Sequence, residues 1–239
     1  MRREEGPDPV QVRAMFGSIA RGYDRANTVL SAGIHHRWRN ELVKWSGACS
    51  GDRVLDCATG TGDLAIAFAK AMGPEGDVTG TDFSPEMLEP APRKAERSGV
   101  RVRFEQADVT SLPYPDASFD IASIAFGIRN VGDRVAGLRE MARVVRPGGR
   151  VMVLEFGQPD GALMRPLFNL YSRRILPVLG GILTGSREAY AYLDRSAGQF
   201  PCRDEFLALM DETGLLGDLE WRAYTGGIAF AYRGVRKEC

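Results

Sequence analysis

Acidic residues surround a glycine-rich segment in the first half of the chain. Asp56 and Asp63 flank the segment 59–62 (Thr-Gly-Thr-Gly), and Asp82 and Asp108 end or follow the next two apolar runs. A glycine has no Cβ, so a bound molecule can approach its backbone closely. Carboxylates accept hydrogen bonds and attract cations. The spacing therefore predicts a site for a small molecule that carries hydroxyl groups or positive charge.

The same segment also fits the dinucleotide-binding fingerprint. Gly60, Gly62 and Ala65 match G-x-G-x-x-A, and Asp82 stands at about the 20-residue distance of the ribose-binding acid in that motif. The phosphates of a dinucleotide, however, would be repelled by Asp56 and the neighbouring acids. S-adenosylmethionine (SAM) has no phosphate, and its sulfonium, ammonium and ribose diol all suit carboxylates. We expect SAM as the cofactor, with an NAD-binding oxidoreductase and a non-catalytic SAM-binding module as the alternatives.

Most of the expected cofactor residues have a role in this hypothesis. The backbone at Gly60, Thr61 and Gly62 approaches the amino-acid part of SAM. Asp82 binds the ribose hydroxyls, and Asp108 accepts a hydrogen bond from the adenine amino group. The full expected set is Asp56, Gly60, Thr61, Gly62, Asp82, Asp108 and Val109. Any one of these aspartates would also suit a turn or a helix cap.

The elements that must position these residues alternate between strands and helices. Strands are predicted at 53–58, 78–81, 102–106, 119–126 and 151–156, and helices at 63–72, 84–97 (kinked by Pro90 and Pro92) and 135–145. A helix at 203–212 precedes a closing strand pair at 219–224 and 228–233, joined by a turn at 225–227. This alternation predicts an α/β fold with a Rossmann-like, doubly wound, mostly parallel seven-stranded sheet.

Two segments lie outside that alternation. Residues 10–45 have a helical pattern with breaks near Gly22 and at 31–33, and residues 159–199 form an irregular, apolar and basic stretch. We therefore expect an N-terminal helical cap at 1–47 and a SAM-binding core at 48–157. A lid or substrate insertion is expected at 158–200. Residues 201–239 should add a helix and a strand pair to the same sheet.

Composition excludes several functional classes. The 239 residues carry 31 Lys+Arg and 31 Asp+Glu, and this balance argues against non-specific binding of nucleic acid. The four cysteines form no C-x-x-C pair, which argues against a zinc ribbon or a disulfide scaffold and favours the cytoplasm. The apolar stretch 175–186 is shorter than the roughly 20 residues of a membrane span. Peripheral contact with the inner face of a membrane and a homodimer both stay open.

Several longer motifs resemble one methyltransferase family. The segments 16–27, 30–39 and 126–131 (FGSIARGYDRAN, LSAGIHHRWR and FGIRNV), with Glu155–Phe156, are similar to the demethylmenaquinone and 2-polyprenyl-6-methoxybenzoquinol C-methyltransferases. Later blocks at 190–193, 200–201 and 226–228 extend the resemblance over almost the whole chain. The sequence departs from the family pattern at Thr59, Ala125, Gly157–Gln158, Asp194–Arg195 and Tyr232. These departures leave the expected SAM site intact and bear on the identity of the quinone substrate.

The resemblance implies methylation of a ring carbon of a reduced polyprenyl quinone in menaquinone or ubiquinone biosynthesis. Demethylmenaquinol and 2-methoxy-6-polyprenylbenzoquinol are the candidate substrates, and another small phenolic is the alternative. The ring carbon becomes nucleophilic when a neighbouring hydroxyl, with a pKa near 10, loses its proton. Arg129 would stabilise that phenolate and Asn130 would orient a hydroxyl, although Arg129 also suits a surface ion pair. Methyl transfer from SAM requires no metal.

The resemblance also implies that the N-terminal segment folds over the active site. Tyr23 would contact the ring or the sulfonium region, and Asp24 could instead cap a helix. His35 suits a hydrogen-bonded structural role better than a catalytic one. Residues 163–186 combine apolar side chains with Arg165, Arg173 and Arg174, a pattern typical of a lipid interface and equally of an internal lid.

Overall fold

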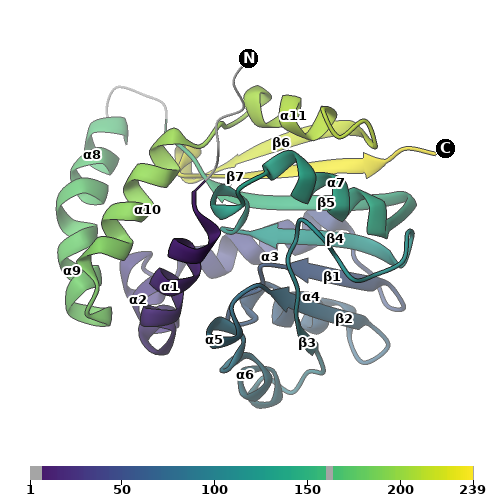
Figure 1. Cartoon of the computed structure of the whole chain (residues 1–239), viewed down its shortest axis with the longest axis horizontal. Helices are drawn as coiled ribbons and strands as arrows, with labels where there is room; N and C mark the ends of the chain where they lie inside the picture. The colour runs from purple at the N-terminus through teal and green to yellow at the C-terminus, as the bar shows by residue number, and fades with distance from the viewer. Residues whose placement is uncertain (1–6, 160–163, 239) are drawn as a thin grey trace.

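Seven strands form a single sheet in the order β3-β2-β1-β4-β5-β7-β6 (Figure 1). The strands are β1 (Arg53–Cys57), β2 (Asp77–Asp82), β3 (Arg103–Gln106), β4 (Phe119–Ala125), β5 (Val145–Phe156), β6 (Leu216–Tyr224) and β7 (Ala229–Arg236). Strand β7 pairs antiparallel with β5 and β6, and the other pairs are parallel. This computed structural model describes residues 7–159 and 164–238. The predicted α/β fold with a mostly parallel seven-stranded sheet is confirmed.

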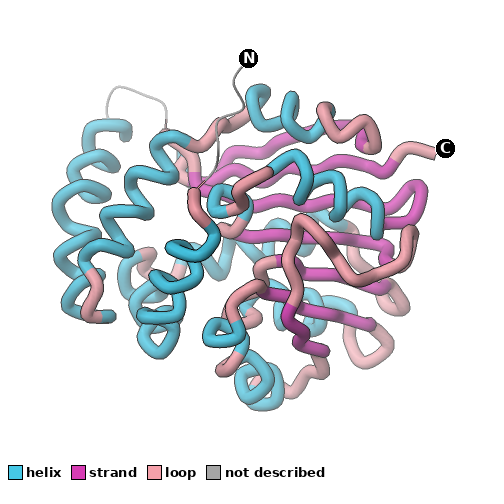
Figure 2. The backbone as a smooth tube through the Cα atoms, viewed as in Figure 1, coloured by secondary structure: helices cyan, strands magenta, loops and turns pink. Residues whose placement is uncertain are grey.

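Helices flank the strands on both faces of the sheet (Figure 2). The α-helices are α1 (Pro9–Ile19), α2 (Tyr23–Leu30), α3 (Ile34–Ser46), α4 (Asp63–Met72), α5 (Pro85–Leu88), α6 (Ala91–Arg97), α7 (Arg134–Val144), α8 (Met164–Leu170), α9 (Leu176–Thr184), α10 (Arg187–Gln199) and α11 (Asp204–Asp211). Short 3₁₀ turns are η1 (Ala20–Gly22), η2 (Ile128–Asn130) and η4 (Thr225–Gly227), and η3 (Tyr171–Ile175) is a π-helical turn.

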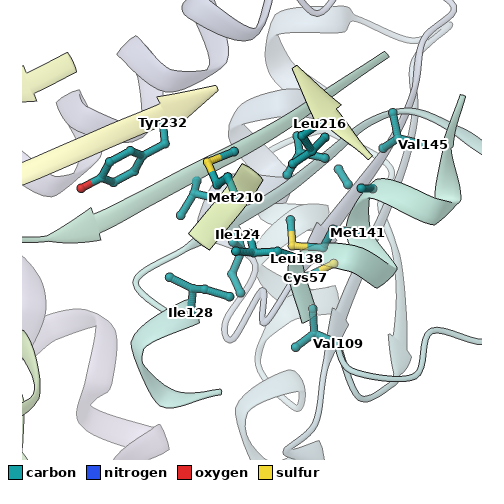
Figure 3. Packing of buried hydrophobic residues seen from close by; sticks show 14 of the residues in the cluster. Cys57, Val109, Ile124, Ile128, Leu138, Met141, Val145, Met210, Leu216 and Tyr232 are labelled. Atoms are coloured by element: carbon teal, nitrogen blue, oxygen red, sulfur yellow. The ribbon is translucent and has the colours of Figure 1, made fainter. Parts of the chain in front are cut away.

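Each face of the sheet has its own apolar core. On one face, Leu138 and Met141 of α7 and Met210 of α11 pack against Ile124 of β4 and its neighbours (Figure 3). On the other face, α3 and α4 bury Trp38, Leu42, Phe68 and further apolar residues. Central strands enclosed in this way consist of nearly continuous apolar residues, and every residue of β1 after Arg53 is buried. The two cores hold the ends of β1, β2 and β4 in fixed positions.

The N-terminal helices meet the later insertion beyond one end of the sheet (Figure 1). Ile19 and Ala26 pack with Ala189 and Tyr190 of α10 in a third apolar cluster. The helix breaks predicted near Gly22 and at 31–33 are confirmed by η1 and by the turn between α2 and α3. Helix α3 belongs to the sheet core rather than to this cap. Residues 1–6 and 160–163 of the expected cap and lid, and Cys239, lie outside the described residues.

The prediction of an irregular stretch over residues 159–199 was wrong. The described part forms α8, η3, α9 and α10. Pro177 occupies the first turn of α9, and Ser186 caps α10 by accepting from the Ala189 N–H group. Gly180 lies where α9 meets α10, and a Cβ there would lie 2.2 Å from the Tyr190 ring. Gly180 therefore allows these two helices to pack closely.

Two strands begin earlier than predicted. Strand β5 starts at Val145, directly after α7, and β6 starts at Leu216. Pro147, Gly148 and Gly149, which follow the predicted helix 135–145, lie within β5 beside a register shift in its pairing with β4. Such irregularities are common at sheet positions where glycine or proline occurs. Among the described helices, none is both long enough and apolar enough to cross a membrane.

Candidate active site

The glycine-rich loop leaves β1 through a strained backbone and enters α4. Ala58 has φ +47°, an uncommon value for a residue with a side chain. Gly62 has φ +85°, and a Cβ there would lie 2.9 Å from Phe104 Cζ. The Gly60 N–H group donates to Asp82 Oδ2 across 2.8 Å, so the end of β2 fixes the loop. Gly62 is therefore required by the fold of the loop itself.

Asp82 and Asp108 both line the cavity next to this loop. Asp82 Oδ1 also accepts from the Ser84 N–H group at 2.9 Å, and burial raises the pKa of Asp82 despite these bonds. Asp108 Oδ1 accepts from the backbone and hydroxyl of Thr110, both at 2.8 Å. Each carboxylate is thus held by its own turn, as an isolated aspartate often is, while it contributes to a shared acidic wall.

Asp56 has a different position from the one expected. Its carboxylate is buried and accepts from Thr59 Oγ1 at 2.6 Å and from Ser123 Oγ at 2.8 Å. Burial raises the pKa of Asp56 to about 6, although both hydroxyls oppose that shift. Asp56 is not among the residues that line the cavity, and neither is Gly62. Asp56 therefore supports the glycine-rich loop through its hydrogen bond with Thr59. This bond also explains why a threonine fits at position 59.

The loop-side cavity has a volume of about 510 Å³ and lies at the carboxyl ends of the parallel strands. Of the expected cofactor residues, its walls include Gly60, Thr61, Asp82, Asp108 and Val109. The position agrees with the general rule for open α/β sheets, because strand order reverses between β1 and β4. Carboxylates and an approachable backbone fit a ligand with cationic and hydroxyl groups. They would not fit the phosphates of a dinucleotide.

A charged cluster connects the N-terminal helices to the loop. Thr61 Oγ1 donates to Asp24 Oδ1 at 2.6 Å, and Lys94 Nζ lies 2.6 Å from Asp24 Oδ2. Lys94 also pairs with Asp63 at the start of α4, and Arg39 Nη1 lies 3.5 Å from Asp63. Asp24 therefore does not cap a helix through its side chain; it attaches α2 to the loop. Four elements, α2, α3, α4 and α6, meet at this cluster.

A second cavity, with a volume of about 230 Å³, lies between the cap and the insertion. Its walls come from α1, α2, α3, η3 and α10, and they are mainly apolar and aromatic. The two cavities share four residues, Phe16, Tyr23, Arg39 and Phe126. Phe126 has φ +58° directly after β4, and its ring stacks 4.4 Å from that of Phe156. This strained position places an aromatic ring on the boundary between the cavities.

Arg129 lines the apolar cavity from η2. Its side chain is 3% exposed, and Nη1 donates to Glu155 Oε1 at 2.7 Å and to the Phe126 carbonyl at 2.5 Å. Nε is buried and has no hydrogen-bond partner in the described part of the chain. A buried N–H group without a partner costs about 1–3 kcal/mol. The ion pair is thus buried rather than at the surface.

Asn130 and Tyr23 line the loop-side cavity close to Arg129. Asn130 Oδ1 accepts from the Tyr192 hydroxyl of α10 at 2.9 Å, so the amide NH₂ is the group left to donate. Tyr23 lines both cavities, and burial raises its pKa although the charges of Arg129 and Arg39 oppose the shift. Tyr23 therefore remains a neutral phenol at physiological pH. The structure brings the three expected catalytic residues together.

Within the described ranges, His35, His36 and Asp63 form the one group of side chains whose spacing could suit a metal ion. Ligating atoms of His35, His36 and Asp63 lie within 4.8 Å of one another. Burial alone would raise the pKa of Asp63, but Arg39 and Lys94 outweigh it and hold this pKa below its usual value. Because these two cations already neutralise Asp63, we assign no metal to the grouping.

Comparisons with known proteins agree with this geometry. Residues 4–236 match the ubiE/COQ5 methyltransferase family. The chain belongs to this family. A "Ubiquinone/menaquinone biosynthesis C-methyltransferase UbiE" of Bdellovibrio bacteriovorus is 59% identical over 97% of this chain and 98% of the relative. A "Demethylmenaquinone methyltransferase" of Deinococcus radiodurans is 43% identical over 95% and 92%.

Solved structures show the same fold at low identity. A SAM-dependent methyltransferase from Thermotoga maritima has a TM-score of 0.65 at 18% identity, covering 94% of this chain and 99% of that one. A phosphoethanolamine N-methyltransferase from Haemonchus contortus, solved with SAM, has a TM-score of 0.63 at 17% identity, covering 84% and 53%. As a member of the ubiE/COQ5 family, the protein is a methyltransferase with SAM as its methyl donor. The oxidoreductase alternative is thereby excluded.

Some departures from the expected family pattern lie on the cavities. Gln158 and Asp194 line the apolar cavity, and Ala125 lines the loop-side cavity. Tyr232 is buried in the core, where its hydroxyl accepts from the Arg203 N–H group at 2.9 Å. The first three can contact a ligand, whereas Tyr232 supports the chain before α11.

Several residues that position the side chains of the site had no role predicted from the sequence. Glu155 is fully buried, Lys94 joins Asp24 to Asp63, and Tyr192 holds Asn130. For Glu155 a signal existed, because a glutamate at the end of an otherwise apolar strand requires a buried partner. For Lys94 and Tyr192 the sequence offers no comparable signal.

Proposed function

We propose that this methyltransferase transfers the methyl group of SAM to a ring carbon of a reduced polyprenyl quinone. The observation that carries the proposal is the shared boundary of the two cavities. An acidic, SAM-compatible cavity meets an apolar cavity at Tyr23, Arg39 and Phe126. Buried Arg129 lies on the apolar side of this boundary. The names of the relatives, which refer to quinone biosynthesis, support the same class of substrate.

In this proposal SAM occupies the loop-side cavity. Asp82 would accept from the ribose hydroxyls, Asp108 would face the adenine, and the backbone at Gly60 and Thr61 would contact the amino-acid part. When bound, SAM supplies an electrophilic methyl group. The protein aligns that group with the ring, and such alignment can account for a large part of the rate gain.

The substrate ring would lie at the boundary, with its apolar tail in the second cavity. Arg129 would stabilise the phenolate because its guanidinium carries a fixed positive charge at the apolar cavity and does not transfer a proton. Glu155 fixes the guanidinium by accepting from Nη1 and from the Arg129 backbone N–H at 3.2 Å. The Asn130 amide orients a hydroxyl, and Tyr23 covers the ring. Tyr23 lies on the boundary, Arg129 lines the apolar cavity and Asn130 lines the loop-side cavity.

A second part of the proposal concerns the membrane. The helical segment 164–184, made of α8, η3 and α9, carries six exposed large apolar residues: Met164, Leu170, Ile175, Val178, Leu179 and Ile182. Exposed arginines at 165, 173 and 174 flank them. Apolar area beside cationic charge favours an anionic lipid surface, where a polyprenyl quinone would be located. We therefore propose peripheral contact through this helical segment, so that the insertion serves as lid and as lipid contact.

The experiment is a product analysis with isotopically labelled SAM. The protein is incubated separately with demethylmenaquinol, with 2-methoxy-6-polyprenylbenzoquinol and with a tail-less phenol. We expect one added methyl on a ring carbon of at least one prenylated quinol. Methylation at oxygen, or equal turnover of the tail-less phenol, would contradict the proposal and favour the alternative of another small phenolic.

A further inference from the structure

One buried histidine lies on the apolar cavity and has no role in the proposed reaction so far. His35, near the start of α3, is 4% exposed and lines the same cavity as Arg129 and Tyr23. Its neighbour His36 is exposed and lines neither cavity. The two rings stack with centroids 3.9 Å apart. The pair therefore offers a test residue and a matched control on one helix turn.

A chain of hydrogen bonds fixes the tautomer of His35. Ser31 Oγ donates its single proton to the Asn27 carbonyl at 2.7 Å, as serine commonly does within a helix. Ser31 Oγ also lies 2.5 Å from His35 Nδ1. Because the hydroxyl proton is already used, Nδ1 must carry a hydrogen and donate to Ser31. The lone pair of the neutral ring is then on Nε2.

The surroundings keep this imidazole neutral. Burial lowers the pKa of His35 to about 3, and the positive charge of Arg39 on the same helix acts in the same direction. His36 and Lys94 also lower this pKa, whereas Asp63 of α4 raises it. The basic lone pair is therefore available throughout the physiological pH range.

The lone pair lies near the boundary between the cavities. Nε2 is 4.0 Å from Asp63 Oδ2. Asp63 lines the loop-side cavity, His35 lines the apolar cavity, and Arg39 lines both. Methyl transfer must occur at this boundary, because only there can a ring in one cavity meet a methyl donor in the other.

We propose that His35 Nε2 accepts the proton that leaves the methylated ring carbon. This proposal rests on the proposed C-methylation. In that reaction an electron pair of the phenolate ring forms the new C–C bond, and the pair of the breaking C–S bond stays on sulfur. The attacked carbon then holds both hydrogen and methyl, and the adjacent C–O group is a carbonyl. Nε2 takes the hydrogen as a proton, and the C–H pair restores the aromatic phenolate.

The low basicity of His35 is sufficient for this step. Loss of the proton regains aromaticity, so the carbon acid is very strong and a weak base can accept from it. The imidazolium, itself a strong acid in these surroundings, then passes its proton to the phenolate oxygen or to water. The balance is one proton released for each methyl transferred. A phenol with a pKa near 10 could not be deprotonated efficiently by the same base, so phenolate formation is left to other groups.

The test separates the proton acceptor from a structural hydrogen bond. In the His35→Asn variant the side-chain amide can still donate to Ser31, whereas the Nε2 atom is removed. We expect kcat to fall about 100-fold, as for loss of a general base, with SAM affinity unchanged by calorimetry. With substrate deuterated at the reacting carbon, the primary kinetic isotope effect on kcat should be clearly above one in the variant. In the parent this ratio should be near one. The His36→Asn variant should behave as the parent.

Other outcomes would overturn the proposal. Full turnover in His35→Asn, or reduced turnover without an isotope effect, would assign His35 a structural role only. If that variant fails to fold or to bind SAM, the parent protein still decides through ¹⁵N NMR of its ring nitrogens. A protonated Nε2 at neutral pH would contradict the acceptor role, and a protonated Nδ1 would support it. Failure of the parent to methylate any quinol would instead contradict the proposed function itself.

Discussion

Arg129 Nη1 lies 2.7 Å from Glu155 Oε1, and both side chains are almost completely shielded from solvent. Glu155 comes from the end of β5 and Arg129 from the turn after β4, so the pair joins two neighbouring strands of the sheet. Removing one member of such a pair leaves an uncompensated buried charge. The pair therefore serves both the stability of the strand ends and the position of the guanidinium.

We predict that Glu155→Gln lowers the free energy of unfolding by about 3 kcal/mol, because Arg129 then lacks a counter-charge. Turnover should fall as the guanidinium loses its fixed position, with SAM affinity retained. Adding Arg129→Met to this variant should recover at least about 1 kcal/mol of stability and no activity. Denaturant unfolding and single-turnover assays measure the two quantities. Additive stability losses would show that the two residues are not coupled.

Asp82 should determine SAM affinity. Its carboxylate lines the loop-side cavity and binds the Gly60 N–H group. Because hydrogen bonds to charged groups contribute about 1.5–3 kcal/mol, Asp82→Ala should weaken SAM binding by about 10-fold to 100-fold in calorimetry. Arg129→Ala, the matched control on the other cavity, should retain SAM affinity and lose turnover. Equal affinity in Asp82→Ala and the parent would refute the ribose assignment.

The contacts of Asp24 should control closure of the cap. Asp24 binds Thr61 of the glycine loop and Lys94 of α6, so Asp24→Asn should loosen α2 from the loop. We expect faster SAM dissociation in stopped-flow experiments and faster proteolysis near α2. Glu86→Gln is the control, because its ion pair with Arg13 is exposed and such pairs contribute little. Identical dissociation rates in both variants would show that the cap is held elsewhere.

Several helix starts and turns of this fold could be predicted from sequence because the residues that cause them lie within the same short segment. Ser84 and Pro85 start a helix, and Pro90 and Pro92 divide it into α5 and α6. The glycine loop follows β1 for the same reason, since its glycines permit the turn. The helices of the insertion could not be predicted in this way. Only the contact between Gly180 and Tyr190 explains why its glycines lie within helices.

The site could be predicted only in part, because a local sequence pattern does not say which way a side chain points or which distant residue it meets. A pattern of strand ends locates Asp56 near the ligand but does not say whether its carboxylate reaches the cavity or is buried below the loop. Partners distant in the chain are also not encoded in any local pattern. Lys94 meets Asp24 across 70 positions, and Tyr192 meets Asn130 across 62. These contacts exist only after the cap and the insertion have packed on the core.

The buried carboxyl of Asp56 should make stability depend on pH. Its pKa is about 6 in the folded protein against 3.8 in the unfolded chain. Between these values the folded state binds more protons, so this group destabilises the fold as pH rises. Asp56→Asn should therefore gain about 3 kcal/mol relative to the parent between about pH 4 and pH 7. Denaturant titrations measure this difference, and a pH-independent difference would contradict it.

The helical segment 164–184 should determine binding to lipid. Ile182 is 75% exposed on α9, and the neighbouring apolar side chains of Val178 and Leu179 are also exposed. Ile182→Asp should therefore reduce co-sedimentation with anionic vesicles, because a charged group replaces apolar surface that would enter the interface. Turnover of a short-tailed quinol in detergent should be unchanged. Val10→Asp is the matched control, since Val10 is 72% exposed on α1, outside this helical segment. Equal vesicle binding by both variants would show that the segment 164–184 is a lid without lipid contact.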